Sequence, residues 1–109
     1  MIAALLLGRK GSVGFPGKNI YPVLGRPLAS YPMLAGINSE NVDNVSISTD
    51  DDDLMELARK NNVEVITRPP ELCTKEALGE DAFVHGYFEI KKRNPGKDIE
   101  IMVLLFCNA

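Results

Sequence analysis

The chain is 109 residues long, enough for one small domain around a single hydrophobic core. Apolar residues make up 45% and charged residues 25%, which excludes a disordered chain, and no apolar run reaches the roughly 18 residues of a membrane span. The formal net charge of −3 hides an asymmetry, because residues 1–39 hold four bases and no acid whereas all 15 acids follow. The asymmetry favours a local anion site over binding of a nucleic acid polymer.

Hydrophobic periodicity predicts four strands that alternate with three helices. In chain order they are a strand at 2–7, a helix at 27–39, a strand at 44–49, a helix at 50–60, a strand at 63–67, a helix at 76–93 and a strand at 99–107. The first strand is apolar throughout, which predicts burial on both faces. This alternation predicts an α/β fold, a Rossmann-like parallel sheet with flanking helices and right-handed crossovers.

Two of the predicted helices contain residues that affect how they bend or pack. Pro32 lies inside the first, where a proline can kink a helix. In the last, Phe83, Tyr87 and Phe88 are interpreted as core residues. Arg9 and Lys10 follow the first apolar run instead of preceding it, which argues against a secretory signal and predicts a cytoplasmic protein.

The residues that could hold a metal are few. Cys73 and Cys107 lie far apart, and His85 is the single histidine, so we expect neither a zinc site nor a disulfide framework and interpret His85 as structural. The acidic run at 50–53 is interpreted mainly as a helix cap that complements the helix dipole. Within that run only Asp50, at the carboxyl end of a strand, is placed to face a ligand.

A glycine-rich segment with the sequence GRKGSVGFPGKN follows the first strand, at the sheet edge where ligands of such folds bind. Its glycines recur at every third position and are Gly8, Gly11, Gly14 and Gly17. Glycines let backbone N–H groups approach a phosphate closely. The segment adds the cations Arg9, Lys10 and Lys18 and the hydroxyl of Ser12. The spacing fits neither the dinucleotide pattern GxGxxG nor the Walker pattern, which fails at Ser12 and Asn19.

These residues resemble the acylneuraminate cytidylyltransferase family, in which the first strand is followed by A-R-x-x-S-K-G-x-x-x-K-N. The resemblance continues in VSISTD at 45–50, similar to the family's V-x-V-S-T-D, and in RPPEL at 68–72, similar to R-P-x-E-L. It ends in VLLFCNA at 103–109, where the family has a strand ending near Q-x-T-S-P. Four motifs in the same order span the whole chain and about the first half of a family member.

The resemblance implies a fold of the nucleotide-diphospho-sugar transferase type, truncated here, with 1–109 as its nucleotide-binding N-terminal part. It also implies a reaction: the anomeric hydroxyl of an acidic nonulosonic sugar attacks the α-phosphate of CTP and releases pyrophosphate. The implied cofactor is Mg²⁺, whose ligands we expect beyond Ala109, so no metal ligand is assigned in this chain. A full-length member is expected to be a homodimer, and the 109 residues alone are expected to bind CTP weakly without turnover.

The resemblance also implies roles for individual residues. Arg9 and Lys18 would be catalytic, through contacts with the CTP phosphates. The residues expected to bind the nucleotide are Gly8, Lys10, Gly11, Ser12, Asn19, Arg68, Ala77 and Gly79. Arg68 would help to hold the cytidine, and Ala77 and Gly79 would act through backbone groups near the base.

Two departures from the family pattern keep other functions open. Val13 stands where the family has a lysine that balances triphosphate charge, and Phe106 stands where many members have a glutamine that faces the sugar. One alternative is a non-catalytic module that binds a nucleotide or another anion. The second is a degenerate enzyme of the P-loop type, which would prefer ATP to CTP.

Overall fold

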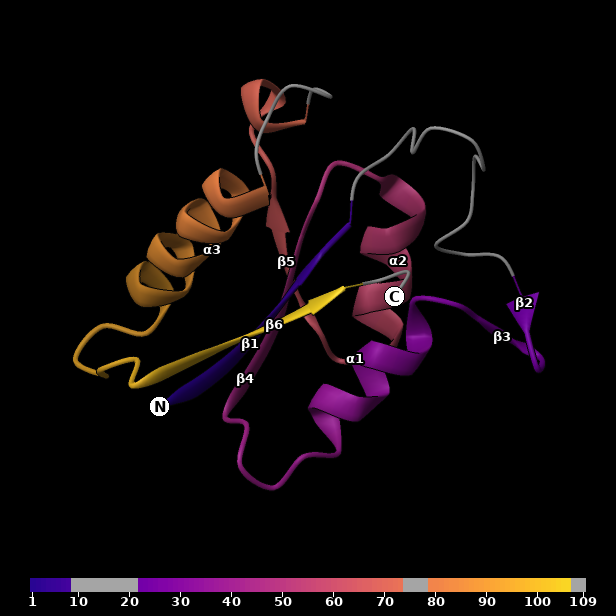
Figure 1. Ribbon diagram of the computed structural model, residues 1–109, viewed down its shortest axis with the longest axis horizontal. Helices are drawn as coiled ribbons and strands as arrows, with labels where there is room; N and C mark the ends of the chain where they lie inside the picture. Colours follow the sequence, from indigo (N-terminus) through magenta and orange to yellow (C-terminus); the bar gives the residue numbers. More distant parts are fainter. Residues whose placement is uncertain (9–21, 74–78, 107–109) are drawn as a thin grey trace.

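The computed structural model describes residues 1–8, 22–73 and 79–106, and it is built around a four-stranded parallel sheet (Figure 1). The strands of this sheet are β1 (Ile2–Leu7), β4 (Asn44–Thr49), β5 (Glu64–Thr67) and β6 (Ile101–Phe106). They lie in the order β5-β4-β1-β6, and all three pairings are parallel. The predicted α/β fold is therefore confirmed, and β1 runs through the interior of the sheet.

The interior strand β1 is buried on both faces, as its continuous apolar run predicts. Ala4 and Leu6 belong to one core cluster and Ala3 and Leu5 to the other, because successive side chains of a strand point to opposite sides. Hydrogen bonds to β4 on one side and β6 on the other satisfy its backbone. A strand in this position has no face in contact with water, so every one of its side chains can be apolar without exposing apolar surface.

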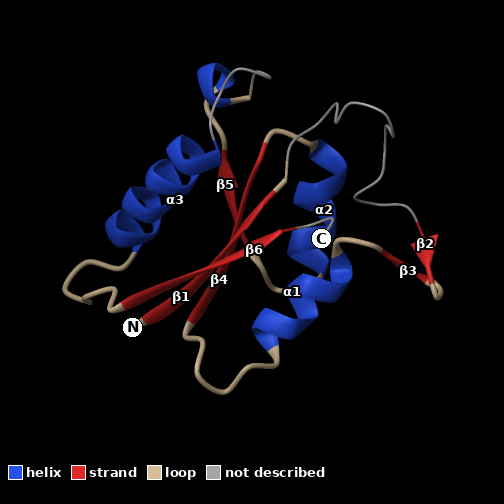
Figure 2. Ribbon diagram, in the orientation of Figure 1, coloured by secondary structure: helices blue, strands red, loops and turns tan. Residues whose placement is uncertain are grey.

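Helices cover both faces of the sheet (Figures 1 and 2). They are α1 (Ser30–Ile37), α2 (Asp52–Lys60) and α3 (Gly79–Arg93). On one face, Met33 of α1 and Leu54 of α2 pack in the same core cluster as β1 and β4, and on the other face Ile90 of α3 packs with Leu5. No helix among the described residues has the length and hydropathy needed to cross a membrane.

A short hairpin precedes α1, and the sequence analysis missed it. β2 (Pro22–Val23) pairs antiparallel with β3 (Arg26–Pro27), away from the main sheet (Figure 2). Leu24 and Gly25 form its two-residue turn and both have positive φ, a combination typical of a type I′ turn. Leucine seldom adopts positive φ, so a leucine at position 24 does not predict a turn. Its side chain is 94% exposed in the structure.

The hairpin also corrects the predicted start of the first helix. Pro27, which we expected in the first turn, belongs to β3, and α1 begins at Ser30. The Ser30 hydroxyl donates a hydrogen bond to the Pro27 carbonyl at 2.6 Å. Pro32 is then the third residue of the helix, where the backbone N–H has no intrahelical partner, so the helix tolerates the proline.

The core face of α3 also differs from the prediction. Ala82, Gly86 and Ile90 form the buried stripe, with a spacing of four residues that keeps them on one side of the helix. Phe88, predicted as a core residue, is 61% exposed on the opposite side, and its ring forms a T-shaped pair with the ring of Tyr87 at a centroid distance of 5.3 Å. The prediction was wrong for Phe88 because the small residues Ala82 and Gly86, not the aromatic ones, allow the helix to approach the sheet.

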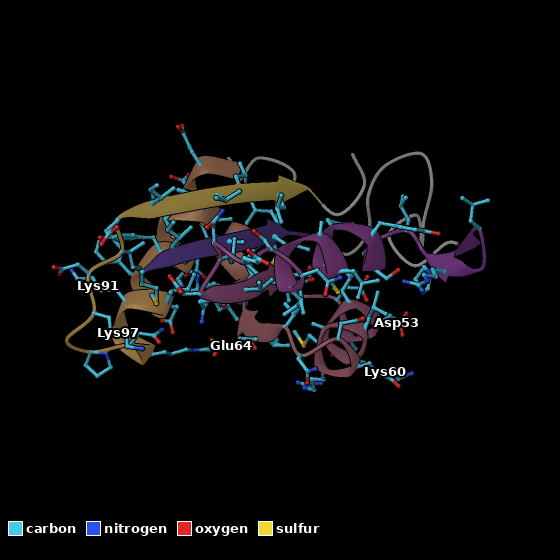
Figure 3. All side chains as sticks on the ribbon, turned by 90° about the horizontal axis from the view of Figure 1, so that it is seen from below. Asp53, Lys60, Glu64, Lys91 and Lys97 are labelled. Atoms are coloured by element: carbon cyan, nitrogen blue, oxygen red, sulfur yellow. The ribbon has the colours of Figure 1, made fainter. Side chains whose placement is uncertain are left out.

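β6 forms one edge of the sheet, with no described strand beyond it (Figure 3). Ile101 and Leu104 of this strand are 53% and 39% exposed. An apolar groove of ≈ 360 Å³ borders Val103 on the α1 side, and one of ≈ 310 Å³ borders Leu104 and Phe83 on the α3 side. The strand contains no charge and no proline, the residues with which edge strands usually avoid pairing with other chains.

We expect a second copy to pair with this edge, so that the 109-residue chain self-associates as its concentration rises. Leu104→Lys places a charge on the exposed edge and should return the chain to a monomer. Sedimentation velocity over a concentration series measures the effect. Val84→Lys is the matched control, because Val84 is an exposed apolar residue of α3, and this variant should associate like the wild type. A wild type that stays monomeric throughout would contradict the expectation.

Candidate functional site

The course of the chain through the sheet marks one edge as the place for a ligand. From β1 the chain moves outward to β4 and β5, and then returns to place β6 on the other side of β1. In parallel α/β sheets, ligands bind beyond the carboxyl ends of the strands, at the point where the strand order reverses. That point lies between β1 and β6 here. Gly8, the first residue of the glycine-rich segment, directly follows β1 at this edge.

Three strands are joined at this edge through one residue, Ser48 of β4. The backbone N–H of Gly8 donates to the Ser48 carbonyl at 3.2 Å. The Nη2 group of Arg68, just after β5, donates to the same carbonyl at 2.9 Å, and its Nε group donates to the Ser48 hydroxyl at 3.2 Å. Gly8 and Arg68, which the sequence analysis singled out separately, are therefore held by the same residue.

Arg68 itself is only 7% exposed, which is unusual for an arginine. Its backbone N–H donates to the Thr49 carbonyl at 3.1 Å and continues the pairing of β5 with β4 beyond the strand end. The hydrogen bonds to Ser48 compensate for part of the cost of burying the guanidinium, since hydrogen bonds to a charged group are stronger than neutral ones. Both the backbone and the side chain of Arg68 are thus oriented by β4.

The chain after Arg68 forms a short 3-10 helix at Pro70–Leu72. The Cys73 thiol at its end lies 3.2 Å from the Pro69 carbonyl. Burial raises the pKa of this thiol, and the charge of Asp50 and a hydrogen bond to it raise it further, while Arg68 has a smaller opposing effect. The thiol is therefore protonated at neutral pH, which fits a structural residue and not a nucleophile.

The acidic run caps a helix, as predicted. The Asp51 carboxylate accepts from the backbone N–H of Asp53 at 2.9 Å, the geometry of a helix N-cap, while Asp52 and Asp53 load the first turn of α2. Figure 3 shows Asp53 on the outer side of α2, away from the sheet. The described residues contain no group of three acidic, histidine or cysteine side chains that could hold a metal ion. His85 lies 3.9 Å from Glu89 on the same helix, an i,i+4 pair.

The structure describes three of the predicted nucleotide-binding residues and brings two of them together. Gly8 and Arg68 meet at Ser48, and Gly79, the first residue of α3, borders the groove beside Leu7 at the end of β1. The other predicted site residues lie outside the described residues, and they are Arg9, Lys10, Gly11, Ser12, Lys18, Asn19 and Ala77. Val13, one of the two departures from the family pattern, lies outside them as well.

Ser48 is the site residue that sequence reasoning missed. The signal was present, because Ser46 and Ser48 are polar residues inside a strand predicted to be buried, and both are 0% exposed. A buried hydroxyl needs a hydrogen-bond partner, so two such residues on one face of a strand indicate polar contacts below that face. The partner of Ser48 comes from a loop 20 residues away, which the strand pattern does not reveal.

Comparison with known proteins identifies the family to which the chain belongs. A family model described as Cytidylyltransferase matches residues 3–85, well over half of the chain. The chain belongs to the cytidylyltransferase family. The matched region contains all of β1 except Ile2, together with the glycine-rich segment and the Arg68 turn, so both segments held by Ser48 lie within the family domain.

Several curated relatives carry N-acylneuraminate or pseudaminic acid in their names. The chain is 36% identical over 98 residues to an N-acylneuraminate cytidylyltransferase of Oncorhynchus mykiss, covering 90% of this chain and 22% of that protein. It is 41% identical over 56 residues to a pseudaminic acid cytidylyltransferase of Campylobacter jejuni, covering 51% of this chain and 24% of the relative. The predicted resemblance to acylneuraminate cytidylyltransferases is confirmed, and the chain spans less than a quarter of these relatives.

Solved structures support the fold of this cytidylyltransferase chain. A CMP:2-keto-3-deoxy-manno-octonic acid synthetase, solved with CTP, superposes with a TM-score of 0.73 at 21% identity and covers 98% of this chain and 40% of its own. A cytidylyltransferase from Leptospira borgpetersenii superposes with a TM-score of 0.70 at 24% identity, covering 97% of this chain and 41% of its own. The parallel sheet and flanking helices described above are therefore the fold of these two solved structures.

Proposed function

We propose that residues 1–109 form the nucleotide-binding N-terminal part of a cytidylyltransferase that transfers CMP from CTP to an acidic nonulosonic sugar, such as an N-acylneuraminate, and releases pyrophosphate. The family match over 3–85 carries the proposal. The names of the curated relatives support this class of sugar. The proposal also includes a cytoplasmic location, from the position of Arg9 and Lys10 after the first apolar run, and, from the resemblance, a homodimer for a full-length protein.

In this proposal the carboxyl edge of the sheet binds the nucleotide. Arg9 and Lys18 would bind the CTP phosphates and stabilise the charge that develops on the leaving pyrophosphate. Around them, the proposed nucleotide contacts are Gly8, Lys10, Gly11, Ser12, Asn19, Arg68, Ala77 and Gly79. The position of Gly8 at the end of β1 and of Arg68 at the end of β5 supports this arrangement, because both lie at the same sheet edge.

The resemblance also implies Mg²⁺, but the described residues do not offer a fitting set of ligands. Asp51 caps α2, and Asp52 and Asp53 are exposed in the first turn of that helix. The proposed source of the ligands remains polypeptide beyond Ala109.

The proposal predicts a preference of the 109-residue chain for CTP over ATP and GTP. Arg68→Ala should reduce this preference more than Ser12→Ala, because Arg68 is proposed to contact the base and Ser12 the phosphates. Isothermal calorimetry with the three nucleotides measures the preference, and circular dichroism shows whether the variant, which loses a buried side chain, is still folded. Equal affinity of the wild type for all three nucleotides would contradict the proposal and favour a general anion-binding module.

Transfer of CMP needs a separate test, since we expect no pyrophosphate release from the 109 residues alone. A chimera would replace the matching 98 residues of the Oncorhynchus mykiss N-acylneuraminate cytidylyltransferase with this segment. Formation of CMP-sugar by the chimera is the expected result. A chimera that folds and binds CTP but transfers nothing would instead support a non-catalytic nucleotide-binding module.

A further inference from the structure

We infer that Ser48 is a positioning residue of the nucleotide site: its hydroxyl sets the orientation of Arg68, and its carbonyl holds both Arg68 and the start of the glycine-rich segment. The inference rests on the proposed function, because it concerns how the residues proposed to bind CTP are held. Ser48 itself is fully buried and is not proposed to touch the nucleotide.

Ser48 accepts hydrogen bonds through two groups, its backbone carbonyl and its side-chain hydroxyl. Its carbonyl accepts from Gly8 N at 3.2 Å and from Arg68 Nη2 at 2.9 Å, which uses both of its lone pairs. Its hydroxyl accepts from Arg68 Nε at 3.2 Å. A guanidinium is planar, so two contacts from different nitrogens to one residue define the direction of its plane. The hydroxyl is the only one of these groups that a substitution of the side chain removes.

Ser46 provides a matched comparison on the same strand. Its side chain lies on the same face of β4 as that of Ser48, two residues away, and both residues are 0% exposed. The Ser46 hydroxyl, however, donates to the side chain of Asn44 at 2.8 Å, at the start of the strand. Ser46→Ala therefore removes a buried hydroxyl of the same kind without touching Arg68.

The inference predicts that removing the Ser48 hydroxyl lowers the affinity for CTP but not the affinity for a triphosphate without a base. Ser48→Ala leaves the carbonyl and its bond to Gly8 in place but removes the hydroxyl that accepts from Arg68 Nε, and a hydrogen bond to a charged group is worth more than a neutral one. CTP affinity should fall on the order of tenfold, towards that of ATP. The affinity for inorganic tripolyphosphate, which has no base, should not change. Ser48→Thr, which keeps the hydroxyl, should restore CTP affinity, and Ser46→Ala should leave both affinities unchanged.

Calorimetry with CTP, ATP and tripolyphosphate tests these variants, and an NMR measurement on the ligand-free wild type tests the contact itself. The Arg68 Nε–H should exchange slowly with solvent in the wild type, and this result stays informative even if Ser48→Ala fails to fold. Rapid exchange there, or a Ser48→Ala chain that keeps its preference for CTP, would overturn the role of Ser48 alone. A wild type that does not bind CTP would overturn the proposed function as well.

Discussion

Replacing Arg9 and Lys18 together with alanine is expected to weaken CTP binding on the order of 100-fold or more. Each side chain is proposed to make a charge-assisted contact with the triphosphate, and such a contact contributes about 1.5–3 kcal/mol. A loss of about 1.4 kcal/mol lowers affinity tenfold, so two independent losses give the expected factor. Calorimetry at fixed ionic strength measures it, because salt screens charges at the protein surface.

The matched control is Lys60→Ala with Lys97→Ala, which changes the net charge by the same amount. Both lysines are exposed, and each precedes the start of a strand, at the opposite end from the carboxyl edge: Lys60 ends α2 before β5 and pairs with Glu56 at 3.4 Å, and Lys97 lies in the loop before β6. This variant should bind CTP nearly as well as the wild type. Equal losses in the two double variants would mean that CTP responds to overall charge, and the glycine-rich segment would lose its proposed role.

Gly86→Ala is expected to lower the free energy of unfolding by about 2 kcal/mol, although alanine is the better helix former by about 1 kcal/mol. A Cβ at this position would lie 2.5 Å from Leu5 Cδ2 and 3.2 Å from Leu5 Cδ1. Leu5 is fully buried in the interior strand, so it cannot move aside without disturbing its neighbours. Overpacking of this kind usually costs about 1–3 kcal/mol, and Gly86→Val should cost more.

Gly79→Ala is the control, because it places the same substitution at the start of the same helix. Nothing lies within 4 Å of a Cβ at Gly79. Its stability should stay within about 0.5 kcal/mol of the wild type, as for most exposed positions. Urea denaturation of both variants measures the difference. If Gly86→Ala were as stable as Gly79→Ala, α3 would not be held close to β1 by the absence of a side chain at Gly86.

Much of the fold was predictable because the relevant signals are local. The strand at Asn44–Thr49 and the last residue of the helix that ends at Lys60 agree with the predictions, since β-branched alternation and the spacing of Leu54 and Ala58 report directly on secondary structure. The hairpin was missed because Leu24 adopts a backbone conformation that its residue type does not favour. The face of α3 was mispredicted because hydrophobic size suggested Phe88, whereas close packing needed Gly86.

For the site, the sequence by itself determined which residue types are available and in which order they leave the strands: a glycine-rich segment after β1 and an arginine after β5. Only the tertiary structure decided that Gly8 and Arg68 meet at Ser48, because that depends on β4 lying between β1 and β5. Periodicity identifies strands but not their order in the sheet, which follows from how the helices pack on its two faces. Contacts between residues far apart in the chain come from that packing, and so does the burial that makes the Ser48 hydroxyl important for Arg68.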